Sequence, residues 1–134
     1  MARRVADRMM SRDRASQGLG MAIDDIGPGY ARLSMIVRAD MLNGHDICHG
    51  GFMFTLADSA FAFACNSRNE STVAAGCSIE FLRPVREGEK LVAEAREQVL
   101  SGRTGVYDAV VRDEAGQPVA VFRGKSARIK GEVV

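Results

Sequence analysis

The chain has 134 residues, 46% of them hydrophobic and 26% charged, with a formal net charge of +1. This length favours one domain over residues 1–134, with a buried core. The balanced charge gives no support for a nucleic-acid partner, and no apolar run is long enough to span a membrane. The N-terminus lacks the apolar part of a secretory signal and the cysteine count is odd, so we expect reduced thiols in a cytoplasmic protein.

Residues 1–18 are expected to form a surface helix, because Val5 and Met9 share a face before the stop signals Gly18 and Gly20. Arginines outnumber acids in this segment. A basic arm that grips phosphate is one interpretation of this excess, and a solvated helix face is the one we favour.

The rest of the chain, apart from a central apolar stretch, predicts strands joined by turns. Two short strands are expected over 21–26 and 30–37, and a third over 72–82 ends before a proline. The last third predicts three long strands: 89–100, 103–113 and 118–130. Consecutive strands with tight turns favour an antiparallel sheet, so we expect an α+β fold with a curved antiparallel sheet wrapped around one long helix.

The central stretch from Asn43 to Ser67 (NGHDICHGGFMFTLADSAFAFACNS) contains that helix. From Phe52 onward apolar residues recur at intervals of three and four, which predicts a largely buried helix of about four turns. Gly50 and Gly51 lie at its start and leave the first backbone N–H groups open to another molecule. Together with the helix dipole, these groups can bind an oxyanion.

Asp58 is the one acid in the helical part of this stretch. Burial without a partner would raise the pKa of its carboxyl group, and such a group suits a general base or a nucleophile. The alternative is that Asp58 lies on the wet stripe of the helix, near Thr55, Ser59 and Ala62. The sequence pattern leaves both interpretations open.

The spacing of Gly50 and Asp58 argues for a site shared by two chains. The two residues are eight positions apart, which is ~12 Å along a helix axis. An oxyanion donor and an attacking group must both lie within ~3 Å of one reacting group. Two antiparallel copies of the helix satisfy this condition, so a catalytic pair is expected to span a two-fold axis.

Six segments now support a family resemblance. They are MLNGH at 41–45, CHGG at 48–51, AD at 57–58 with ACNS at 64–67, FLRP at 81–84, TGVYD at 104–108 and FRGKS at 122–126. In this order they resemble hotdog-fold thioesterases of the phenylacetic-acid-degradation (PaaI-like) type. The resemblance implies hydrolysis of acyl-CoA thioesters, with preference for phenylacetyl-CoA or ring-hydroxylated phenylacetyl-CoA. It also implies no metal or other cofactor, and a homotetramer of two dimers with the active site at the dimer interface.

The resemblance also implies roles for individual residues. Asp58 would activate water or attack the thioester, Gly50 would polarise the thioester carbonyl through its N–H, and Asn43 would orient the water or carbonyl. Some relatives hold the water with a Ser or Thr in the strand after the helix, where this chain has Ala-Ala-Gly at 74–76. The predicted substrate-binding residues are His49, Gly51, Arg83, Arg103, Thr104, Gly105, Arg123 and Lys125.

The reasons for these binding residues are chemical. Cationic side chains suit the phosphates of CoA, although each is also an ordinary exposed sheet residue. Thr104 and Gly105 would let pantetheine run beside the strand. The acyl pocket would use Phe52, Phe54 or Phe61, each of which also suits the core.

Four alternatives compete with hydrolysis. His45, Asp46, Cys48 and His49 contain metal-ligand types, but they are too close in sequence for usual zinc loops. A Cys48 nucleophile needs a histidine that faces it, which a sequence neighbour seldom does, so we expect His49 to support the glycine turn by hydrogen bonding. The third alternative is a non-catalytic acyl-CoA-binding or sensing protein, and the fourth is a hotdog dehydratase. A desolvated acid beside an oxyanion donor favours hydrolysis over both.

Overall fold

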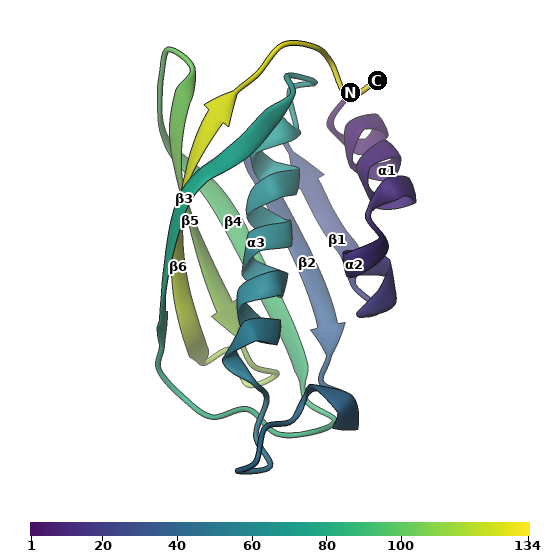
Figure 1. Cartoon of the computed structure of the whole chain (residues 1–134), viewed down its shortest axis with the longest axis vertical. Coiled ribbons are helices and arrows are strands. Elements are labelled where there is room, and N and C mark those ends of the chain that lie inside the picture. The colour runs from purple at the N-terminus through teal and green to yellow at the C-terminus, as the bar shows by residue number, and fades with distance from the viewer.

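The computed structural model describes all 134 residues, and its main feature is a curved sheet wrapped around one helix (Figure 1). The elements in chain order are α1 (Ala2–Arg12), α2 (Arg14–Gly18), β1 (Ala22–Gly27), β2 (Tyr30–Ile36), the 3-10 helix η1 (Ala39–Met41), α3 (Gly50–Asn66), β3 (Thr72–Phe81), β4 (Lys90–Ser101), β5 (Thr104–Arg112) and β6 (Pro118–Arg128). The six strands form one sheet in the order β1-β2-β4-β5-β6-β3, and every neighbouring pair is antiparallel. The predicted α+β architecture is confirmed.

The core lies between α3 and the inner face of the sheet. Alternate residues of the central strands point inward, as the period of two requires, and these include Leu33 on β2 and Ala93 on β4, both fully buried. Phe61 of α3 is 1% exposed, and its ring lies 5.6 Å from that of Tyr107 and 5.7 Å from that of Phe122. Phe61 is therefore a core residue and does not line an acyl pocket.

The N-terminal segment is two helices where one was expected. Asp13 separates α1 from α2, and its side chain caps α2 by accepting a hydrogen bond from the Ser16 N–H at 2.9 Å. Val5 is fully buried, as its predicted helix face requires. Helix α1 packs against β1 and α3, and α2 packs against α3, on the side of α3 away from β3 (Figure 1). None of the helices combines the length and the apolar character that crossing a membrane requires.

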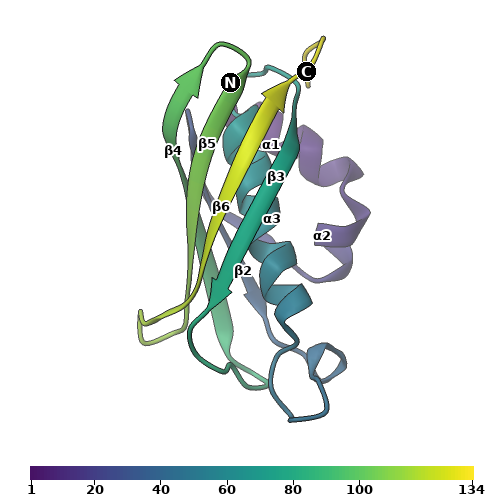
Figure 2. The same ribbon diagram turned by 60° about the vertical axis from the view of Figure 1, so that its left-hand side comes forward.

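Strand β3 forms one edge of the sheet and pairs only with β6 (Figure 2). Its residues from 73 to 78 are uncharged and exposed, and Val73 and Phe81 expose about half of their surfaces, 47% and 50%. Edge strands normally carry charges or prolines that prevent pairing with another chain. The edge at β1 differs, because it carries Asp24 and Asp25 and packs beside α1.

Candidate active site

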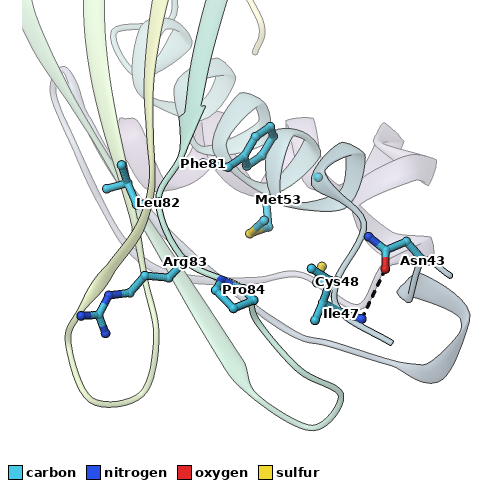
Figure 3. A pocket seen from close by; sticks show the side chains of 9 residues that line it. Asn43, Ile47, Cys48, Met53, Phe81, Leu82, Arg83 and Pro84 are labelled. Atoms are coloured by element: carbon cyan, nitrogen blue, oxygen red, sulfur yellow. Dashed lines mark hydrogen bonds between the residues drawn. The ribbon is translucent and has the colours of Figure 1, made fainter. Parts of the chain in front are cut away.

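A pocket of about 430 Å³ opens beside the first turn of α3 (Figure 3). Its lining comes from the loop before α3, the start of α3 and the end of β3: Asn43, Ile47, Cys48, Gly50, Met53, Phe81, Leu82, Arg83 and Pro84. The pocket brings together two predicted catalytic residues, Asn43 and Gly50, with one predicted binding residue, Arg83. Most of the lining side chains are apolar, and Asn43 and Arg83 are the polar side chains among them.

Gly50 presents an open backbone N–H at the start of α3. The helix begins here, as expected from the glycine pair at its start, and His49 acts as its N-cap by accepting the Gly51 N–H on Nδ1 at 2.9 Å. The expected hydrogen-bonding support from His49 is thereby confirmed. The Gly50 N–H has no acceptor within the chain, since the first N–H groups of a helix lack intrahelical partners. A carbonyl oxygen of a ligand can accept this N–H.

Asn43 is held by its own loop. The side-chain Oδ1 of Asn43 accepts the backbone N–H groups of His45 at 2.9 Å and of Ile47 at 3.4 Å. The backbone N–H of Asn43 donates to the Ile47 carbonyl at 2.9 Å. Asp46 completes this tight loop with a φ of 59°. Because Oδ1 is engaged, the side-chain Nδ2 is the group that can donate to a ligand in the pocket.

Asp58 does not line the pocket that contains Gly50. Its half-buried carboxylate has no hydrogen-bond donor and no ion-pair partner. The pKa of Asp58 is raised above its ordinary value, chiefly by burial and secondly by the negative charge of Asp13. Asp58 also lies on a partly exposed stripe of α3 with Thr55 and Ala62. It therefore combines the missing partner of a desolvated acid with the position on the wetter stripe of the helix.

Cys48 is not arranged as a nucleophile. Burial raises the pKa of its thiol, which disfavours the reactive thiolate, and its Sγ lies 3.6 Å from the carbonyl oxygen of His49. The His49 Nδ1 is already occupied by the Gly51 N–H. No three His, Cys, Asp or Glu side chains lie together as metal ligands.

His49 and Gly51 flank the pocket residue Gly50, whereas the other predicted binding residues lie away from the pocket. Arg103, Thr104 and Gly105 lie near the C-terminal end of α3, where Arg103 lines a small cavity that also contacts Cys65. Close packing explains Gly105, because a Cβ there would lie 2.7 Å from Ser126 Oγ. Their binding roles remain predictions.

Two further cations, Arg123 and Lys125, are exposed on β6, where they alternate with the buried Phe122 and Gly124. They therefore project from the face of the sheet opposite to α3. Arg123 Nε and Nη2 donate to the Asp108 carboxylate at 2.6 and 2.8 Å, so this guanidinium already has a partner. Their roles in CoA binding are likewise predictions.

The sequence pattern did not single out the apolar wall of the pocket. Phe81 and Met53 lie close together in Figure 3 and Phe81 packs on Gly50, whereas Phe52 and Phe54, the expected acyl contacts, are absent from the lining. The available signal for Phe81 was an aromatic residue at the end of a strand whose only charged residue is Glu80. Contact with Gly50 depends on tertiary packing.

A sheet of this order wrapped around one buried helix, with a pocket at the helix start, is the hotdog fold. The family model of the thioesterase superfamily matches residues 45–120. The chain is 45% identical to the acyl-coenzyme A thioesterase PaaI of Escherichia coli (strain K12) over 128 residues, 96% of this chain and 91% of that protein. The chain therefore belongs to the thioesterase superfamily, as the resemblance predicted.

Solved structures agree with this assignment. The E. coli PaaI protein from the phenylacetic acid degradation operon matches with a TM-score of 0.96, covering 98% of this chain and 95% of that one. A mutant of the phenylacetic acid degradation protein PaaI from Thermus thermophilus is 41% identical, with a TM-score of 0.84, and covers 87% of this chain and 100% of that one.

Proposed function

We propose that this protein hydrolyses acyl-CoA thioesters, with phenylacetyl-CoA or its ring-hydroxylated forms as preferred substrates. The observation that carries the proposal is an open Gly50 N–H in a half-apolar pocket, together with an acid, Asp58, that lacks any partner. The names of the relatives support the substrate class. The ring of Phe81 and the side chain of Met53 suit an aryl group.

The active site in this proposal is completed by a second copy of the chain. Asp58 is ~12 Å from Gly50 along the helix, too far for both to act on one carbonyl. If the uncharged edge of β3 pairs with the same edge of another copy, the two α3 helices run antiparallel on one side of a continuous sheet. The Gly50 end of one helix then approaches Asp58 of the partner subunit. Two such dimers would form the tetramer.

The reaction follows from these positions. The Gly50 N–H donates to the thioester oxygen and stabilises the negative charge that develops when the carbonyl carbon is attacked. The carboxylate of Asp58 either removes a proton from the attacking water or attacks the carbon itself, which would give an anhydride that water then cleaves. In both routes the C–S bond breaks and the departing CoA thiolate takes up a proton. The Asn43 amide would orient the water or the carbonyl.

Thiol release from a panel of acyl-CoAs tests the activity. Wild type and Asp58→Ala would be compared on phenylacetyl, hydroxyphenylacetyl, and short and long aliphatic substrates. We expect rapid release from the aryl-acetyl substrates that is lost in Asp58→Ala. Tight CoA binding without release from any substrate would instead indicate a non-catalytic acyl-CoA-binding protein.

Mixed dimers test whether the site is shared. Gly50→Ala and Asp58→Ala, each expected to be strongly impaired alone, would be unfolded together and refolded as a 1:1 mixture. A shared site gives one intact site in each hybrid dimer, so about a quarter of the wild-type activity should return. No recovery, with hybrids present, would place the whole site within one chain.

A further inference from the structure

The junction between α1 and α2 lies beside the middle of α3, the part of the helix that carries Asp58 (Figure 1). Ser59, the next residue, is 8% exposed, and its Oγ lies 2.8 Å from Ser16 Oγ of α2. Ser16 in turn contacts Asp13 twice, through its N–H to Oδ1 at 2.9 Å and through its Oγ to Oδ2 at 2.6 Å. A chain of hydrogen bonds thus connects Asp13 with the residue after Asp58.

The direction of these hydrogen bonds can be deduced. An ionised carboxylate only accepts, so the Ser16 hydroxyl donates its single proton to Asp13. Ser16 must then accept at its contact with Ser59, and the Ser59 hydroxyl donates to it. The Ser59 proton therefore points toward α2 and is not available to the neighbouring Asp58 carboxylate.

The charges around Asp58 leave its negative charge uncompensated. The titratable groups near it are Asp13 from the N-terminal segment, Cys77 from β3 and Cys65 from α3 itself. No basic side chain is among them. The strands beneath α3 face it with mostly apolar side chains, and the buried Tyr107 on β5 donates to Glu97 at 3.2 Å.

We propose that Asp13 is a positioning residue for Asp58. Its fixed negative charge makes the Asp58 carboxylate a stronger base, and the chain through Ser16 and Ser59 keeps hydroxyl donors turned away from that carboxylate. The inference rests on the proposed hydrolysis and gives the N-terminal segment a part in it. Asp13 itself does not touch the substrate; it acts through Asp58. The raised pKa of Asp58, caused first by burial and then by Asp13, agrees with this arrangement.

The variant Asp13→Asn tests the proposal, because asparagine keeps one oxygen to accept the Ser16 N–H, removes the charge, and replaces the oxygen that accepts the Ser16 hydroxyl with an NH2 donor. The acid limb of the kcat/KM profile should move to lower pH by roughly 0.3 to 1 unit, as expected when one nearby charge is removed. At neutral pH kcat should fall about two- to fivefold, because the base is weaker, with KM nearly unchanged. Asp7→Asn is the matched control: it removes a charge from the same segment, in an exposed pair with Arg3, and should leave the limb in place.

A merely structural role would give a different result. If Asp13→Asn lowers the melting temperature and kcat but leaves the acid limb unmoved, Asp13 is only a helix cap and the proposal is overturned. Should Asp13→Asn fail to fold, Asp13→Ser, which also caps a helix, replaces it in the same comparison. Carbon-13 NMR titration of the Asp58 carboxyl in wild type and variant gives a readout that needs no substrate. If wild type releases no thiol, the proposed function fails. If the pKa of Asp58 is the same in wild type and in Asp13→Asn, the coupling to Asp13 is overturned, whatever the activity.

Discussion

The ring of Phe81 lies directly against Gly50, so close that a Cβ on Gly50 would stand 2.8 Å from Phe81 Cζ. The two residues come from different elements, the end of β3 and the start of α3. Their contact places an aromatic surface beside the open N–H that we assign to the thioester oxygen. A methyl group at position 50 must displace this ring.

The first prediction concerns Gly50→Ala. We expect kcat for thiol release to fall about 10- to 100-fold, because the displaced ring and the new methyl group disturb a donor of the oxyanion site. The melting temperature should change little, since Phe81 is 50% exposed and its ring can move outward. Gly27→Ala is the control, because a Cβ there meets nothing within 4 Å. Unchanged kcat in Gly50→Ala would remove Gly50 from the site.

The second prediction concerns the acyl group. Phe81→Leu should reduce the ratio of kcat/KM for phenylacetyl-CoA over acetyl-CoA by about 10-fold, because the aryl group loses a ring contact. Val99→Leu, at an exposed position near the far end of β4, is the control for a general effect of the substitution. Equal losses on both substrates would mean that Phe81 does not select the acyl group.

The third prediction concerns pH and stability. The folded chain raises the pKa of Asp58, by burial first and by Asp13 second, so ionised Asp58 opposes folding. Asp58→Asn should therefore raise the melting temperature at neutral pH, by about 1 to 3 °C because water screens a half-exposed carboxylate. The gain should vanish below the ordinary pKa of an aspartate, where Asp58 is protonated in both states. Glu87→Gln, in an exposed loop, should show no such gain.

The fourth prediction concerns the edge of β3. Gly76→Lys fits the single chain, since a Cβ at Gly76 meets nothing within 4 Å, but it places a charge on the edge assigned to the second copy. Sedimentation should show a shift to monomer, and thiol release should fall with it. Gly27→Lys makes the same change near the end of β1, where a Cβ is equally unobstructed, and should leave assembly intact. A fully assembled Gly76→Lys protein would place the interface elsewhere.

Most of the fold could be predicted because its signals are local. The six strands predicted from strand patterns and turns lie within two residues of their observed bounds. The break at Asp13 was missed, although Asp is a preferred N-cap residue, because Val5 and Met9 suggested one continuous face. The capping side chain of Asp13 ends α1, although the hydrophobic periodicity alone would allow the helix to continue.

The candidate site was only partly predictable. Gly50 and His49 were identified from the chemistry of a helix start, and Asp58 from an acid in an apolar run. The packing of Phe81 on Gly50 and the link from Asp13 to Ser59 both join residues far apart in sequence. The pairing of Arg123 with Asp108 also required the register of β5 with β6, in which these residues are direct partners.

The half-exposed position of Asp58, away from the pocket that contains Gly50, has a consequence for how activity should depend on concentration. If each active site combines Gly50 of one chain with Asp58 of another, an isolated chain has no complete site. The rate of turnover then follows the fraction of protein that is assembled. Specific activity should then fall steeply on dilution below the dimer dissociation constant and recover on concentration. Substrate that bridges both halves would favour the assembled form, so the enzyme would be most completely formed when its substrate is abundant.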